Sequence, residues 1–217
     1  MTTQTLLPAE VYQGQFGEFT ITQSDRTGVI IYRTGLMVAA LSFAIGSALV
    51  LFYNNPIVTA LTPLYTCFIL ALGVSLFTIH IYMALLHRML QVFWAIGTIA
   101  SVILAISSTE PLALTVYNQP LTLFGVGFIF VALTGIYFKE AVCFNRLETK
   151  VLTPIVPVLL LGHLVGILPT QGESVLLGIW ATLFLVFALR KTVQEIPADI
   201  GDKSVFTYLK EQRLAKV

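Results

Sequence analysis

The chain has 217 residues, of which 57% are hydrophobic and only 11% are charged. An average soluble domain carries about 25% charged residues, so this composition excludes an ordinary water-soluble fold. The formal net charge of +1 gives no electrostatic basis for nucleic-acid binding, and no nucleic-acid partner is predicted. The two cysteines, Cys67 and Cys143, are too few for a disulfide scaffold.

Residues 1–28 form a polar segment, which we interpret as a cytoplasmic N-terminal tail. The run from Gly17 to Gln23 alternates apolar and polar residues, a pattern typical of a short strand. The run from Ser24 to Gly28 is rich in turn-forming residues and predicts a turn before the first apolar segment.

Six apolar segments approach the roughly 20 residues that a helix needs to cross a hydrocarbon core of about 30 Å. They cover residues 29–53, 57–86, 90–107, 121–138, 151–168 and 174–189. The sequence therefore predicts an all-α polytopic membrane protein, a six-transmembrane-helix bundle over residues 29–189 that is embedded in a lipid bilayer. Residues 190–217 are expected to form a charged C-terminal tail, and residues 203–216 within it an amphipathic helix.

The distribution of basic residues predicts the orientation of the bundle. With six spans, all 12 Lys and Arg residues fall on the side that also holds both termini. Glu110 and Glu173 fall on the other side, which has no basic residue. Because Lys and Arg near helix ends are retained in the cytoplasm, both termini are predicted to be cytoplasmic.

A polar segment between the fourth and fifth spans concentrates charge at this cytoplasmic face. One interpretation is a solvated loop that serves orientation alone. The other is a partly buried ion-pair cluster, joined by a residue from the first span, that binds an anionic lipid headgroup or docks a membrane-protein partner. The residues predicted for this partner or lipid-headgroup site are Arg33, Lys139, Glu140, Cys143, Arg146 and Glu148.

Histidines within the predicted spans suggest a different function. His163 is placed near the middle of the fifth helix, where an ionisable group is a functional candidate. A neutral histidine bonded to a neighbouring backbone group or hydroxyl is one interpretation, and a haem or chlorophyll ligand or a proton-relay group is another. His80 and His87 are predicted to share one face of the second helix, and His80 is the candidate second ligand.

Proline and glycine residues raise a third hypothesis. Pro154 and Pro157 either bend the fifth helix, as in a transporter or channel for a small neutral solute, or mark an ordinary helix start capped by Thr153. Gly162 and Gly166 form a Gly-x-x-x-Gly pattern that favours close helix packing, within the bundle or across a homo-oligomer seam.

No catalytic signature is present in the sequence. It contains no glycine-rich phosphate loop, no His-Glu-x-x-His and no Cys-x-x-Cys. We therefore predict no catalytic residue and no metal site, and leave the cofactor unassigned. The leading hypothesis is a non-enzymatic interaction, assembly or lipid-binding protein that works through its cytoplasmic face.

Several segments together resemble one known family. They are Tyr32–Gly35, His80–Tyr82, Thr134–Glu148 and Pro157–Leu164, and Lys-Glu-x-x-Cys-Phe within the third is the most specific. The chain from about residue 10 to 190 is similar to the domain of unknown function 2301 family of bacterial integral membrane proteins, familiar mainly from cyanobacteria. This resemblance implies a multi-span protein of the plasma or thylakoid membrane and no assigned activity.

Overall fold

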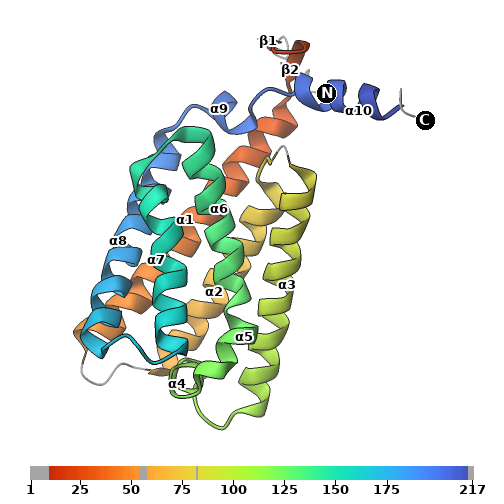
Figure 1. The fold of residues 1–217 in the computed structure, drawn as a ribbon. Coiled ribbons are helices and arrows are strands. Elements are labelled where there is room, and N and C mark those ends of the chain that lie inside the picture. The colour runs from red at the N-terminus through yellow and green to blue at the C-terminus, as the bar shows by residue number, and fades with distance from the viewer. Residues whose placement is uncertain (1–9, 54–57, 82, 215–217) are drawn as a thin grey trace, which may run out of the picture.

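The computed structural model describes residues 10–53, 58–81 and 83–214, and most of them are helical (Figure 1). The long helices are α1 (Gln23–Phe52), α2 (Val58–Thr78), α3 (Ala84–Ser107), α6 (Phe128–Phe144), α7 (Leu147–Leu164) and α8 (Thr170–Val193). The short ones are α4 (Leu112–Asn118), the 3-10 turn η1 (Pro120–Thr122), α5 (Leu123–Val126), α9 (Ile196–Ile200) and α10 (Ser204–Leu214).

The long helices form a bundle of membrane-spanning dimensions. Within the described residues, five helices are each long and apolar enough to cross a membrane, or six if the bent pair of Pro120–Val126 and Phe128–Phe144 counts as one span. This architecture confirms the predicted all-α polytopic bundle. We call the end that carries the α6–α7 turn and α10 the charged end, and the end that carries α4 the opposite end (Figure 1).

In this pair the chain bends by 59° between α5 and α6. The bend falls at Gly127, where an added Cβ would lie 2.3 Å from the carbonyl oxygen of Leu123. In contrast, α7 continues through Pro154 and Pro157 from a start at Leu147. The predicted helix start at Pro154 is therefore wrong, and Thr153 donates its hydroxyl to the Thr149 carbonyl instead of capping.

The second predicted span is too long, because α2 ends at Thr78 and α3 begins at Ala84. The apolar run is continuous across this break, so hydropathy alone does not reveal it. The ring Nε2 of His87 lies 2.6 Å from the carbonyl oxygen of Leu76, and the Gln91 side-chain amide donates to the same oxygen at 3.5 Å. These polar groups from α3 satisfy a carbonyl that the end of α2 leaves free.

Close helix contacts and aromatic rings form the core. At Gly35 an added Cβ would lie 2.7 Å from the Ser75 hydroxyl and 2.8 Å from the Ala71 carbonyl, so α1 and α2 approach closely there. In the buried centre, the Trp180 indole N–H donates to the Tyr137 hydroxyl at 3.2 Å. The Gly162–Gly166 pattern has another role, because Gly166 takes a φ of +69° and ends α7.

A β-hairpin precedes the bundle and contacts the other end of the chain. Strands β1 (Glu10–Gly14) and β2 (Gly17–Ile21) pair antiparallel, and β2 confirms the strand predicted there. The chain then enters α1 through a capping box of Thr22 and Asp25, so the turn predicted from Ser24 to Gly28 is helical instead.

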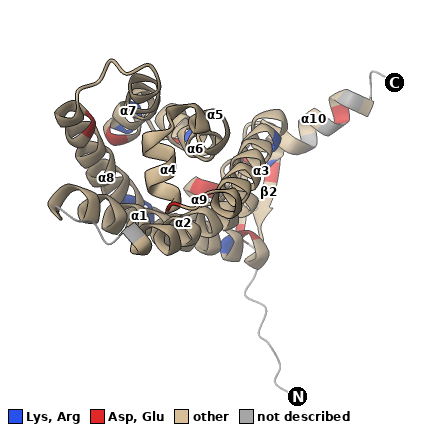
Figure 2. Cartoon of the chain, turned by 90° about the horizontal axis from the view of Figure 1, so that it is seen from below, with Lys and Arg blue, Asp and Glu red and all other residues tan. Residues whose placement is uncertain are grey.

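The last helix, α10, meets this hairpin at the charged end and projects sideways from the bundle (Figure 2). The Gln15 N–H donates to Asp202 at 2.6 Å and the Phe16 N–H to the Ser204 hydroxyl at 3.1 Å. The rings of Phe16 and Tyr208 stack with centroids 4.0 Å apart. The two terminal segments therefore form one small unit at the charged end.

Candidate functional site

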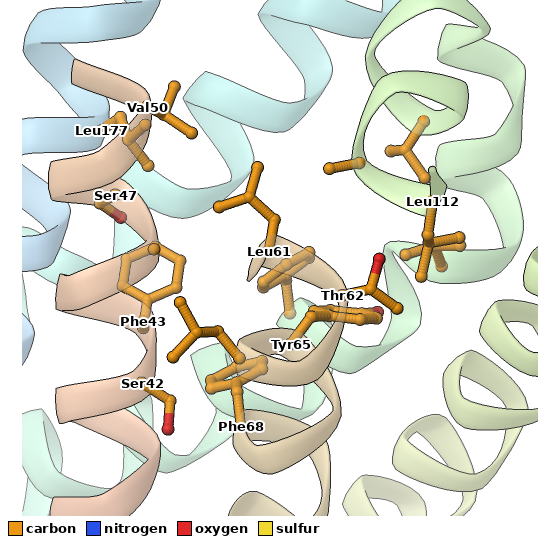
Figure 3. Close-up of a pocket in the computed structure, with 16 residues that line it drawn as sticks. Ser42, Phe43, Ser47, Val50, Leu61, Thr62, Tyr65, Phe68, Leu112 and Leu177 are labelled. Carbon is orange, nitrogen blue, oxygen red and sulfur yellow. The ribbon is translucent and has the colours of Figure 1, made fainter. Parts of the chain in front are cut away.

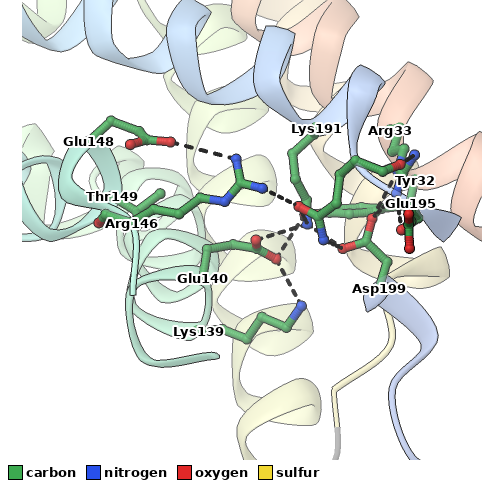
Figure 4. A network of polar contacts seen from close by, with 11 residues as sticks. Tyr32, Arg33, Lys139, Glu140, Arg146, Glu148, Thr149, Lys191, Glu195 and Asp199 are labelled. Carbon is green, nitrogen blue, oxygen red and sulfur yellow. Dashed lines mark hydrogen bonds and ion pairs between the residues drawn. The ribbon is translucent and has the colours of Figure 1, made fainter. Parts of the chain in front are cut away.

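A network of charged side chains from five helices lies at the charged end (Figure 4). We call it the charged cluster. Its members are Arg33 on α1, Lys139 and Glu140 on α6, Arg146 and Glu148 beside and in the first turn of α7, Arg190 and Lys191 on α8, Gln194 after α8, and Asp199 on α9.

Lys191 is the centre of the cluster and is completely buried. Its ammonium group forms a short ion pair with Asp199 and lies 2.8 Å from Oε2 of Glu140, at angles outside those of a hydrogen bond. It also lies over the rings of Phe144 and Tyr32, 4.5 and 5.7 Å from their centroids. A buried ammonium needs such partners, because its desolvation without them costs several kcal/mol.

Arg33 connects α1 to the segment that follows α8. Its Nε donates to Asp199 Oδ2 at 2.8 Å, and its two Nη atoms donate to the backbone carbonyls of Gln194 and Glu195 at 2.6 and 3.0 Å. The planar guanidinium thus satisfies carbonyls at the helix end and a carboxylate together. This contact holds α9 against the bundle.

Glu140 joins the cluster to α6. It is completely buried, and its Oε1 accepts a hydrogen bond of 2.8 Å from the ammonium group of Lys139, the preceding residue. The Tyr32 hydroxyl lies 3.5 Å from the same oxygen. Both carboxylate oxygens of Glu140 therefore face cations, Lys139 on one side and Lys191 on the other.

The outer part of the cluster surrounds Glu148. Arg190 donates to Glu148 Oε2 at 3.0 Å, whereas Arg146 Nη1 and Glu148 Oε1 are 3.8 Å apart. Among the described residues neither of these two buried atoms has a hydrogen-bond partner. Arg146 Nη2 donates to the Gln194 side chain at 2.6 Å, which links the outer part to the inner one.

The structure brings five of the six residues predicted for the headgroup or partner site into this cluster. The exception is Cys143, which is exposed on α6 and lies outside it. The predicted polar loop is also shorter than expected, because α6 continues to Phe144 and α7 begins after a turn at Asn145, which has a φ of 53°. Lys139 and Glu140 are consequently helical and buried, and the solvated-loop interpretation is wrong for them.

The sequence did not identify Arg190, Lys191, Gln194 and Asp199 as site residues. All four lie in the segment predicted to be a charged C-terminal tail, and α9 folds back against α1. A basic residue at the end of a span is an ordinary orientation signal, so nothing in Lys191 itself indicated a buried ion pair.

His163 lies in the last turn of α7, at the opposite end, and not at the middle of a span. The helix begins four residues earlier than predicted and ends at Leu164. Its ring Nδ1 is 2.7 Å from Glu173 Oε1, and its Nε2 is 3.1 Å from the Tyr117 carbonyl. Both ring nitrogens face protein oxygen atoms, and one of these belongs to a carboxylate rather than to the backbone group or hydroxyl that the sequence suggested.

His80 lies in the connection between α2 and α3, at the charged end, so it does not share a helix face with His87. It is separated from His163 by the length of the bundle (Figure 1). Its Nε2 is 4.0 Å from an oxygen of Asp25. Burial lowers the pKa of His80 and the nearby Asp25 opposes this effect. The described residues contain no group of three or more His, Cys, Asp or Glu placed to hold a metal ion.

The family model described as uncharacterized integral membrane protein (DUF2301) matches residues 74–208, which include α6, α7, α8 and α9 with most of the charged cluster. No match was found among curated proteins or among solved structures. The chain therefore belongs to the DUF2301 family of integral membrane proteins.

Proposed function

We propose that this protein is a non-enzymatic membrane protein that binds anionic phospholipid headgroups at its charged end, and that this end faces the cytoplasm. The observation that carries the proposal is the surplus of cations in the charged cluster. Five cationic side chains share three carboxylates, and each carboxylate is already paired within the cluster. The surplus positive charge favours an external anion.

The position of the outer cations supports a lipid headgroup as that anion. The Arg190 side chain is 53% exposed and Lys150 is exposed on the neighbouring helix α7. Large apolar side chains beside them, Leu147 and Leu189, are also exposed. Cations that border an exposed apolar surface at the end of a spanning helix are typical of the headgroup layer.

The inner residues have a supporting role in this proposal. Arg33, Lys139 and Glu140 are buried and paired, so they hold α1, α6, α8 and α9 in place instead of meeting a lipid directly. Arg146 is the connection between the two parts, because it contacts Gln194 on the inner side and Glu148 on the outer side. The rigid inner part thereby positions the exposed cations.

The test is lipid retention by protein purified into nanodiscs or released from them for native mass spectrometry. Each exposed basic residue near an anionic surface contributes about 1 kcal/mol. The double variant Lys150→Gln/Arg190→Gln is expected to weaken binding of phosphatidylglycerol by roughly 30-fold relative to wild type. Binding of phosphatidylcholine should not change.

Arg88→Gln is the single-charge control, since Arg88 is an exposed basic residue near the start of α3 at the same end. This substitution removes one positive charge, as Lys150→Gln and Arg190→Gln each do, but at a position away from the α6–α7 turn. If Arg88→Gln weakened phosphatidylglycerol binding as much as the double variant, a site at this turn would be contradicted. The headgroup site would also be contradicted if the protein showed no preference for anionic lipid and instead retained a protein partner through Lys150 and Arg190.

The orientation has its own test, for which the chain supplies a reporter. Cys143 is exposed at the charged end, and Cys67→Ser leaves it as the single thiol. A membrane-impermeant maleimide should label this variant in permeabilised cells and not in intact ones. Labelling of intact cells would place the charged end outside the cytoplasm and overturn the proposed orientation.

A further inference from the structure

An apolar pocket of about 230 Å³, partly open to the outside of the bundle, lies between the helices toward the opposite end. We call it the cavity, and Figure 3 shows the residues that line it. Its walls come from the second half of α1, the first half of α2, α4, the α5–α6 bend and α8. It is larger than the ~150 Å³ engineered cavity that binds benzene. No charged side chain lines it.

Two serine hydroxyls on α1 distinguish this cavity from a simple packing defect. Ser42 and Ser47 are only 7% and 5% exposed, and both line the space (Figure 3). Within the described part of the chain, neither hydroxyl has a hydrogen-bond partner. By the rise of an α-helix, they lie about 15 and 8 Å from the end of α1 at Phe52, well within the spanning region.

Other hydroxyls in the bundle behave differently. Ser101, Thr134 and Thr153 each donate to the carbonyl four residues earlier in their own helix. Buried hydroxyls in helices ordinarily make this bond. An unpaired hydroxyl at membrane depth is costly because no water is available there. Ser42 and Ser47 therefore present unused hydrogen-bonding capacity to the cavity.

We propose that this cavity binds a neutral amphiphile, an aliphatic chain that carries a hydroxyl or carbonyl group, with the polar group bonded to Ser42 and Ser47. The apolar lining takes up the chain, and its lack of charged side chains disfavours an ionised headgroup. This site is separate from the proposed headgroup site, because Leu177 in its wall precedes Arg190 by roughly 20 Å along α8.

Tryptophan fluorescence gives a direct test. The chain has two tryptophans, and Trp180 is 2% exposed with its ring centroid 4.5 Å from that of Phe43 in the cavity wall. Trp94 is only half-buried, so lipid-dissolved probes reach it directly. In a Trp94→Phe background, a terminally brominated fatty alcohol should quench Trp180 saturably, because bromine quenches indole fluorescence only at short range.

Filling the cavity is the first perturbation. A Cβ at Gly46 would contact Leu61 and Leu64 at 3.8 and 4.0 Å, so Gly46→Leu extends into the space without a clash at its base. It should abolish the saturable quenching. Gly178→Leu is the matched control, since the nearest atom to its Cβ is Leu51 Cδ1 at 3.6 Å and it does not line the cavity.

Removing the hydroxyls is the second perturbation. Ser42→Ala/Ser47→Ala should weaken the brominated alcohol about fivefold, the equivalent of one net hydrogen bond, and leave the corresponding brominated alkane unaffected. Ser75→Ala is the control, because its hydroxyl bonds the Tyr32 carbonyl on the other half of α1. Melting temperatures in detergent show whether each variant is folded.

Solvent extraction of the purified protein then identifies the natural occupant. A neutral amphiphile recovered from wild type and lost in Gly46→Leu would support the proposal. Phospholipid as the only extracted species would overturn the assignment of a neutral polar group. Absence of saturable Trp180 quenching, or equal quenching in folded Gly46→Leu and wild type, would overturn the site itself.

Discussion

Lys191, in the last turn of α8, and Glu140, on α6, form an ion pair of 2.8 Å in which both side chains are completely buried. Each has a second partner, Asp199 for the lysine and Lys139 for the glutamate. With Arg33 these residues make an inner group of three cations and two carboxylates. Because cations outnumber carboxylates in this group, removing the charge of Glu140 and removing that of Lys191 should affect stability unequally.

Glu140→Gln is expected to be more destabilising than Lys191→Met. The first change leaves three buried cations around one carboxylate, and breaking a buried pair in this sense costs about 3–5 kcal/mol. The second leaves two cations and two carboxylates, each with a partner, and keeps most of the side-chain volume. Thermal unfolding in detergent measures both, with the double variant closing a mutant cycle. Equal losses of stability in Glu140→Gln and Lys191→Met would contradict this argument from charge balance.

Arg33→Lys should release the segment that follows α8 without unfolding the bundle. Lysine keeps the charge but cannot donate to Asp199 and to the carbonyls of Gln194 and Glu195 together. Amide hydrogen exchange over residues 194–200 is expected to accelerate, while exchange in the core of α6 stays slow. Arg190→Lys, an exposed arginine that contacts one carboxylate, is the control and should leave this segment protected.

The junction between the hairpin and α10 should loosen in acid. The hydrogen bond from the Gln15 N–H, followed by that from the Ser204 hydroxyl, lowers the pKa of Asp202 below its usual value. A carboxylate with a lowered folded-state pKa contributes stability above the unfolded pKa of about 3.9, and that contribution is lost as the pH falls through the folded value. The protection of the amides of residues 10–21 against hydrogen exchange, relative to their intrinsic rates, should therefore fall below about pH 4.

Asp202→Asn tests the assignment of this pH dependence. The variant should show fast exchange in the hairpin already at neutral pH and little further change in acid. Glu18→Gln, an exposed carboxylate on β2 of the same hairpin, should retain the wild-type profile. If Asp202→Asn showed the same acid transition as wild type, the transition would belong to a group other than Asp202.

His163→Phe should weaken the opposite end and leave the visible spectrum unchanged. A phenyl ring can keep the stacking on Tyr117, whose ring centroid is 4.9 Å away, but it loses the contacts to Glu173 and to the Tyr117 carbonyl. The expected cost is about 1–3 kcal/mol in the free energy of unfolding. If purified wild type showed a Soret band that this variant lacked, the hydrogen-bonding role of His163 would be contradicted.

The sequence was sufficient to predict those structural features that depend on local composition. The long apolar runs predicted the membrane bundle, since a hydrocarbon core accepts only segments that satisfy their own backbone hydrogen bonds. Lys and Arg positions predicted a single charged end, and Lys139, Glu140, Arg146 and Glu148 were among the residues predicted for a site there. Helix boundaries were less predictable, because the break between Thr78 and Ala84 interrupts a continuous apolar run.

Only the tertiary structure showed which charged groups meet and which polar groups remain unpaired. Lys191 joins Glu140 because α6 and α8 present these faces to one another and α9 folds back with Asp199, and rotation of a helix about its axis is not encoded in its hydropathy. Ser42 and Ser47 are ordinary small residues in the sequence. They become candidate ligand contacts because packing of α1 against α2, α4 and α8 leaves a cavity beside them.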